Sequence, residues 1–365
     1  MPATPQLVIF AASRLDRSNS KVGPAVWVRF EYDLVLIGNV FRTGNYLVAF
    51  VQNNIAVMDW AEGNQHHRPP GPDDLLFQNL LSAEWIIYSF YQQAVNLYTP
   101  SSFTSLGYPN NTYDRIAQIR NNEAGHIRIF QNQISNTSVT PGPCQYNYNL
   151  TAEDPATFLA LQVYIEVNSM AFLTGLVRQA ETLDTRSALV AIASVETRHN
   201  TWSLIDIWDV LPFSGPSDTI YPYPNQILSL TNEFVIPGSC PTENPEYPFP
   251  NQHLPSISLN TTHTSTSTST MTGQPGSTIQ LIFNGEVKIE EGREYYAVFF
   301  HGVQVVSVLF EFGTNETVVP GCFDREAGIV ALVIADEVGA PTEESVVAGP
   351  LLLLEQPGVL TTVIS

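Results

Sequence analysis

The apolar and polar positions between residues 74 and 208 repeat with the three-to-four-residue period of amphipathic helices. Pro, Gly and polar residues divide this part of the chain into four segments. The predicted helices cover residues 74–97, 112–134, 155–180 and 184–208. Asp154 followed by Pro155 is a typical helix start, and Asp184 is the predicted cap of the fourth helix. The long polar connection at 135–154 has the length and position of the crossover that one class of four-helix bundles requires.

The pattern changes from helical to extended after residue 277. Gly and Pro separate short apolar runs, which predicts a small Ig-like β-sandwich. The predicted strands cover residues 278–283, 295–301, 303–310, 329–335 and 346–354. Residues 24–60 are also apolar and β-like, and 226–234 could form a short helix. We therefore expect an N-terminal extension of unclear structure (1–72), a four-helix bundle (73–212), a Pro/Ser/Thr-rich connector (213–277) and a β-sandwich (278–356).

Each of the four predicted helices carries a Glu on its apolar face or in a Glu-x-x-His pair. In chain order these residues are Glu84, the pair Glu123/His126, Glu166, and the pair Glu196/His199. Residues three apart on a helix share a face, so each pair points in one direction. One Glu-x-x-His is weak evidence, because surface helices carry many Glu residues. The complete set in this order, on four helices, predicts a dinuclear metal site inside the bundle.

The charges of these six side chains also favour metal ions. An unpaired carboxylate on a core-facing stripe costs several kcal/mol or more. Four carboxylates and two divalent cations balance when both histidines are neutral. Carboxylate and imidazole ligands suit iron or manganese, and zinc is also compatible. Tyr88, Tyr91 and Tyr164 lie near the Glu positions, either as hydrogen-bond donors to the ligands or as core packing.

The composition excludes some classes of function. The net charge is −20 and only Lys21 and Lys288 are lysines, so a nucleic-acid partner is not expected. No apolar run reaches the roughly 18 residues of a transmembrane helix. A Gly-rich phosphate loop and a Gly-x-Ser-x-Gly motif are both missing from the sequence. The sequence makes no prediction of the oligomeric state.

Sequons and cysteines favour a secreted or cell-wall location. The predicted N-glycosylation sites are Asn110, Asn136, Asn149, Asn260 and Asn315. Three cysteines, all in loops rich in Pro or Gly, allow one disulfide. We expect Cys144 to pair with Cys240 and Cys322 to stay free. The short apolar run at 7–12 lacks the features of a signal peptide, so no signal peptide is evident in this N-terminus.

Several segments resemble the fungal secreted ferritin-like domain proteins, which belong with the stress- and starvation-responsive and desiccation-related proteins. The similar segments are "LLSAEWIIYSFY", "NNEAGHIRIF", "YIEVNSMAF" and "ASVETRHN", with "PGPC" in the crossover and "SCP" and "NPEYPFP" downstream. The resemblance covers roughly residues 73–255 and is weaker from 278 to 356. It implies an α+β multidomain chain, with a ferritin-like bundle followed by the sandwich. Carried over by position, the family's metal ligands are the same six Glu and His residues.

Three functions follow from these features. The first is a di-iron or di-manganese oxidoreductase, of oxidase or catalase-like type, that acts on O₂ or peroxide in a stress response. In this enzyme the residues that act through the metals on a small-molecule substrate are Glu84, Glu123, Glu166 and Glu196. The second is a non-catalytic secreted or cell-wall-associated protein whose metal site is structural or vestigial. The third, an iron-storage cage, is disfavoured because a bulky β domain would obstruct assembly.

Overall fold

The computed structural model describes six short strands between residues 8 and 59, and then residues 69–209, 219–260, 275–323 and 329–354. The chain divides into two compact units, residues 1–68 and 69–365. In the first unit the described strands are β1 (Val8–Phe10), β2 (Val26–Phe30), β3 (Asp33–Ile37), β4 (Val40–Thr43), β5 (Tyr46–Val51) and β6 (Asn54–Asp59). They form two antiparallel sheets, in the orders β1-β2-β3 and β4-β5-β6. The strands β2 to β6 all lie within residues 24–60, the segment predicted to be β-like.

The second unit begins with the predicted helices, of which four exceed twenty residues in the described part of the chain. They are α1 (Asp74–Leu97), α3 (Thr112–Gln133), α4 (Pro155–Gln179) and α5 (Leu183–Asp206), with the short helix α2 (Pro100–Thr104) between the first two. Their ends lie within two residues of the predicted ends. The predicted cap of α5 was wrong: Thr182 accepts the Thr185 N–H, and Asp184 lies in the first turn. An acidic side chain there still interacts favourably with the helix dipole.

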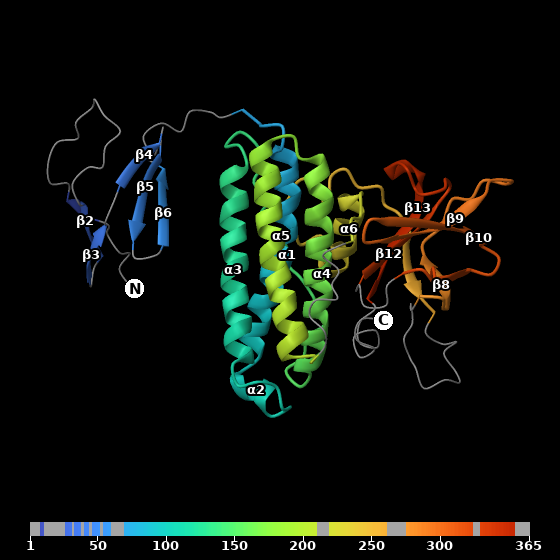
Figure 1. The fold of residues 1–365 in the computed structure, drawn as a ribbon, viewed down its shortest axis with the longest axis horizontal. Coiled ribbons are helices and arrows are strands. Elements are labelled where there is room, and N and C mark those ends of the chain that lie inside the picture. The colour runs from blue at the N-terminus through green and yellow to red at the C-terminus, as the bar shows by residue number, and fades with distance from the viewer. Residues whose placement is uncertain are drawn as a thin grey trace. The chain divides into compact units, whose positions relative to one another are not determined.

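Hydrogen bonds at one end of the bundle fix the helix directions. At the start of α1, the Asp73 carboxylate accepts the N–H groups of Glu181 and Thr182 at 2.7 and 3.0 Å. Asp74 accepts the Ser135 N–H at 2.7 Å. The start of α1 thus meets the end of α3 and the α4–α5 turn, so α3 and α4 run in parallel (Figure 1). The crossover at 134–154 returns the chain along the bundle, as ferritin-like connectivity requires.

Among the described helices, only α4 is long and apolar enough to cross a membrane by length and composition. Within its most apolar window, 72% of the residues are buried inside the protein, which is the pattern of a core helix. Asp154 caps the start of α4, where its side chain accepts the Thr157 N–H. Ala180 is the residue at the other end, and its N–H donates to the Leu176 carbonyl.

After α5 the described chain contains helix α6 (Pro224–Leu230), the 3-10 turn Thr231–Phe234, and seven strands. The strands are β7 (Ser256–Leu259), β8 (Thr278–Asn284), β9 (Tyr295–His301), β10 (Gln304–Phe310), β11 (Glu316–Val318), β12 (Ile329–Ala335) and β13 (Val346–Leu354). They form two antiparallel sheets, with the orders β10-β9-β12-β13 and β11-β8-β7. All five predicted strands are present. The strands β7 and β11 were missed because three or four residues are too few to show alternation.

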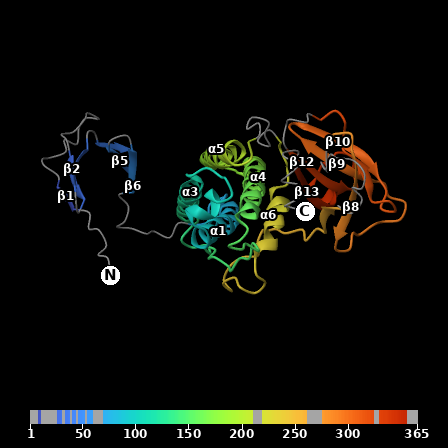
Figure 2. The same ribbon diagram turned by 90° about the horizontal axis from the view of Figure 1, so that it is seen from below.

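The central strands β9 and β12 of the four-stranded sheet are buried on both faces. Their residues Val298, Phe300 and Val333 belong to the same hydrophobic core as the helices. Phe299 and Leu332, on the opposite face, pack with the three-stranded sheet. The sheet is therefore the middle layer between the helices and the second sheet, as the view along the bundle shows (Figure 2).

Candidate metal centre

Four helices bring the six predicted Glu and His residues together in the middle of the bundle. Glu84 comes from α1, the Glu123/His126 pair from α3, Glu166 from α4 and the Glu196/His199 pair from α5. All six side chains are buried, with exposed fractions between 0 and 6%. Each pair sits on one face of its helix because its members are three residues apart.

Each histidine is surrounded by three carboxylates. The Nδ1 atom of His126 lies 2.9 Å from Glu123 Oε2, 3.2 Å from Glu196 Oε1 and 3.4 Å from Glu84 Oε1. The second histidine repeats this arrangement. Its Nδ1 lies 3.0 Å from Glu123 Oε1, 3.3 Å from Glu196 Oε2 and 3.6 Å from Glu166 Oε2.

These contacts form two overlapping groups of four ligand atoms. One group contains Glu84 and His126, the other contains Glu166 and His199, and both contain Glu123 and Glu196. Within each group the ligand atoms lie within 4.8 Å of one another. In both shared carboxylates, Glu123 and Glu196, one oxygen lies next to His126 and the other lies next to His199. The two groups together could hold metal ions, with Glu123 and Glu196 contributing to both.

Without cations, the buried cluster can balance its charge only by holding protons. Burial, with Glu196 and Glu123 nearby, raises the pKa of Glu166 to about 8, although His199 opposes this. Burial and Glu123 likewise raise the pKa of Glu84 well above its ordinary value. Burial alone would lower the pKa of His199, but the surrounding carboxylates raise it to about 12. Burial would raise the pKa of Glu196, yet the two histidines lower it to about 2.

Unpartnered atoms test whether the cluster fits metal ions. One oxygen each of Glu84, Glu123 and Glu166, and both oxygens of Glu196, are buried without a hydrogen bond. The Nδ1 atom of His199 is also unpartnered. One imidazole N–H cannot satisfy three carboxylates, and buried polar atoms are normally hydrogen-bonded. Two divalent cations would use these atoms, so the side chains present are compatible with a metal site.

Two further side chains hold the ligands in place. The hydroxyl group of Tyr91 donates a hydrogen bond to Glu166 Oε1. The Oδ1 atom of Asn122 lies 3.4 Å from His199 Nε2, where it can accept the second ring proton. Such contacts orient metal-binding histidines and carboxylates. The sequence pattern pointed to Tyr91 but gave no signal for Asn122, which is exposed and precedes Glu123.

The other tyrosines near the Glu positions do not contact the cluster. The hydroxyl group of Tyr88 donates a hydrogen bond to Gln92 Oε1 at 3.2 Å. Tyr164 is half-buried, and its pKa is raised by burial and by Glu233, not by the clustered carboxylates. Gln162, one turn before Glu166, is fully buried with both amide atoms unpartnered.

The crossover is tied to the segment that follows α6. Cys144 and Cys240 form a disulfide across 96 residues, and Cys322 is free and exposed.

Among the sequon asparagines, Asn110, Asn136 and Asn149 are exposed, whereas Asn260 and Asn315 are half-buried.

Comparison with protein families agrees with the helical geometry. The model of the ferritin-like domain matches residues 73–204, a range that contains α1 to α4, most of α5 and all six clustered side chains. A search of curated proteins finds no significant match to this chain. Residues 73–204 thus form a ferritin-like domain with a buried carboxylate and histidine cluster that is compatible with metal binding.

Proposed function

We propose that the ferritin-like domain holds two iron or manganese ions and uses them in redox chemistry with O₂ or peroxide. The observation that carries this proposal is the pair of four-ligand groups that share Glu123 and Glu196. Glu84 and His126 would complete one position, and Glu166 and His199 the other. When bound, the ions would supply the electrons for the reaction.

The protein's own residues would position the ions and exclude water. Tyr91 stays protonated, because burial and Glu166 raise its pKa well above its ordinary value, and so it can donate to that ligand. The turns before and after the ligands of α1 and α3 carry buried apolar side chains, among them Leu80, Ile87, Ile119 and Ile127. This burial favours a substrate as small as O₂ or peroxide, since a larger molecule would have to separate the helices.

Strand order supports an Ig-like sandwich for the C-terminal region. Ig-like folds place strands A, B and E in one sheet and C, F and G in the other. In chain order, β7, β8 and β11 correspond to A, B and E, while β9, β12 and β13 correspond to C, F and G. The additional strand β10 pairs with β9 at the edge of the second sheet.

A secreted location is proposed on two grounds. The Cys144–Cys240 disulfide is typical of oxidising compartments. The sequons at Asn110, Asn136 and Asn149 lie on exposed positions that a glycan could occupy. The resemblance to fungal stress- and desiccation-related proteins supports the role in stress.

The burial of the six clustered side chains also favours a second candidate function, that of a secreted or cell-wall-associated protein that does not catalyse a reaction. Ligands that are at most 6% exposed can serve as a structural metal site that joins four helices. The two candidates share the metal site and differ in whether the bound ions react.

Elemental analysis of untagged protein tests the site, and activity assays separate the two candidates. We expect two metal ions per chain in the native protein and none in the double variant Glu84→Ala, Glu196→Ala. Glu153→Ala, which removes an exposed carboxylate, should keep its metal. Consumption of O₂ or peroxide by the loaded protein supports the enzyme, and loaded protein that is inert in both assays supports the structural role. If the native protein takes up no metal, both candidates are wrong.

A further inference from the structure

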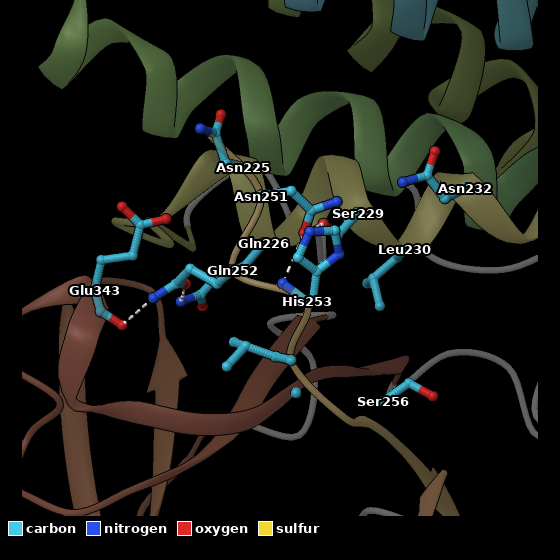
Figure 3. Close-up of a pocket in the computed structure, with 12 residues that line it drawn as sticks. Asn225, Gln226, Ser229, Leu230, Asn232, Asn251, Gln252, His253, Ser256 and Glu343 are labelled. Carbon is cyan, nitrogen blue, oxygen red and sulfur yellow. Dashed lines mark hydrogen bonds between the residues drawn. The ribbon is translucent and has the colours of Figure 1, made fainter. Parts of the chain in front are cut away.

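A polar cavity of about 170 Å³ lies where the helical region meets the β region (Figure 3). Its walls come from α6 with the following 3-10 turn, from the extended segment 251–256, and from the β region at Glu343 and Gly349. The cavity is separate from the metal centre, since none of the six clustered residues lines it. Binding pockets commonly form at such junctions between structural units.

Side-chain amides dominate the lining of this cavity. Five of its twelve lining residues are Asn or Gln, namely Asn225, Gln226, Asn232, Asn251 and Gln252. Ser229 and Ser256 add hydroxyl groups, and Leu230 and Leu254 add apolar surface. Among these described lining residues there is no Lys or Arg, and the imidazole of His253 lies 3.0 Å from Glu246 Oε1, so an anionic ligand would find no free cationic side chain.

A chain of hydrogen bonds holds the amides in fixed orientations. The Tyr221 hydroxyl group donates to Gln226 Oε1, and Gln226 Nε2 donates to Gln252 Oε1 at 2.6 Å. Gln252 Nε2 in turn donates to the Glu343 backbone carbonyl at 2.8 Å. Ser229 Oγ donates to Asn251 Oδ1 at 3.1 Å. Each amide has two N–H donors and an oxygen with two lone pairs, so this network leaves hydrogen-bonding capacity unused.

Two acceptor atoms beside the cavity have no partner. Asn225 is buried, with an exposed fraction of 7%, and its Oδ1 atom accepts no hydrogen bond. Glu343 Oε1 is likewise buried and unpartnered. Burial and the neighbouring Glu344 raise the pKa of Glu343. Leaving such groups unsatisfied costs about 1–3 kcal/mol each, so a shift of either side chain that lets a ligand hydroxyl group reach its buried oxygen would favour binding.

We propose that this cavity binds a neutral, hydroxyl-rich ligand the size of one sugar ring. Its volume would hold about six water molecules at ~30 Å³ each, and it is below the ~300 Å³ at which pockets for drug-sized ligands begin. Amides pair with neighbouring hydroxyl groups as both donor and acceptor, and Leu230 and Leu254 can cover the apolar face of a ring. The site gives the protein a second binding function that does not depend on the metal centre.

Saturation-transfer NMR and titration calorimetry on the full chain test this site, with glucose, mannose, galactose and N-acetylglucosamine as probes. We expect at least one sugar to bind with a dissociation constant of about 1 mM, which is typical for so small a ligand. Gln252→Leu should weaken binding about tenfold by removing one set of amide contacts. Ser256→Trp changes an exposed residue at the rim, leaves the amide network intact, and should block the cavity. Gln131→Leu makes the same chemical change on an exposed part of α3 and should have no effect.

The outcomes separate this proposal from its alternatives and from the metal centre. Sugar binding that both cavity variants weaken, and that persists after chelation of metal, supports the site. Melting curves and metal content show whether each variant is folded, and Ser256→Trp remains informative if Gln252→Leu is not. The proposal is overturned if no sugar binds at tens of millimolar, or if the cavity variants behave like Gln131→Leu.

Discussion

Removal of the metal should destabilise the ferritin-like domain, and the loss should grow as the pH rises from 5 to 8. In metal-free protein, Glu166 and His199 have pKa values of about 8 and 12, above their ordinary values of 4.5 and 6.5. A group with a raised pKa stabilises the folded state fully below its unfolded pKa, and this contribution disappears as the pH rises through the folded pKa. Glu196 shifts the other way, to about 2, so its contribution is lost only below pH 4.5 and is constant in this range.

The pKa of Glu166 gives the size of the effect. Between pH 5 and pH 8 the folded state keeps a proton that the unfolded state has released, over nearly three pH units. At 1.36 kcal/mol per unit, the free energy of unfolding of the metal-free protein falls by about 3.5 kcal/mol. His199, with its raised pKa, adds to this loss above pH 6.5. Metal ions replace these protons, so loaded protein avoids the loss and binds metal more tightly at higher pH.

Thermal unfolding followed by circular dichroism would measure this effect. Protein treated with a chelator is compared with protein reloaded with Mn²⁺ at pH 5, 6.5 and 8, and the difference in Tm should widen at each step. The double variant Glu84→Ala, Glu196→Ala should show no difference at any pH. A Tm difference that is the same at pH 5 and pH 8 would refute the charge argument, and its complete absence would refute metal binding.

Three other substitutions test the surrounding structure. Asp73→Ala removes the carboxylate that accepts two N–H groups of the α4–α5 turn. It should lower the free energy of unfolding by about 2 kcal/mol in urea titrations near pH 7. Because those N–H groups hold the pKa of Asp73 below 3.8 despite its burial, the difference between the variant and the native protein should vanish in strong acid. Replacing Cys144 and Cys240 by Ser opens a 96-residue separation and should cost up to about 4 kcal/mol, seen as a lower urea midpoint. Tyr91→Phe should weaken metal binding about tenfold in competition with a chelating dye without abolishing it, whereas Tyr88→Phe should leave affinity unchanged.

The helices and the six clustered residues could be predicted because each depends on local spacing. The helical period places Glu123 and His126 on one face wherever the helix lies, and the order of the four segments then limits how they can meet. The end of a helix depends on finer competition: Thr182 and Asp184 are both good caps, and the sequence alone favoured the wrong one. Contacts between distant segments had no local signal. The bonds from Asp73 to the α4–α5 turn join residues 108 and 109 positions apart, and no periodicity reports them.

The strand β12 shows how far an apolar pattern can be interpreted. Its seven residues, Ile329–Ala335, are all apolar and all buried, so the strand lacks the alternation of a sheet with one face in water. Such a run indicates a strand that is covered on both sides, but it cannot say by what. The structure supplies the answer, since Ala331 and Val333 pack into the core of the helices while Val330 and Leu332 pack into that of the second sheet. The C-terminal sheet and α6 thus share the hydrophobic interior of the ferritin-like domain, which fixes the walls of the polar cavity between α6 and the β region.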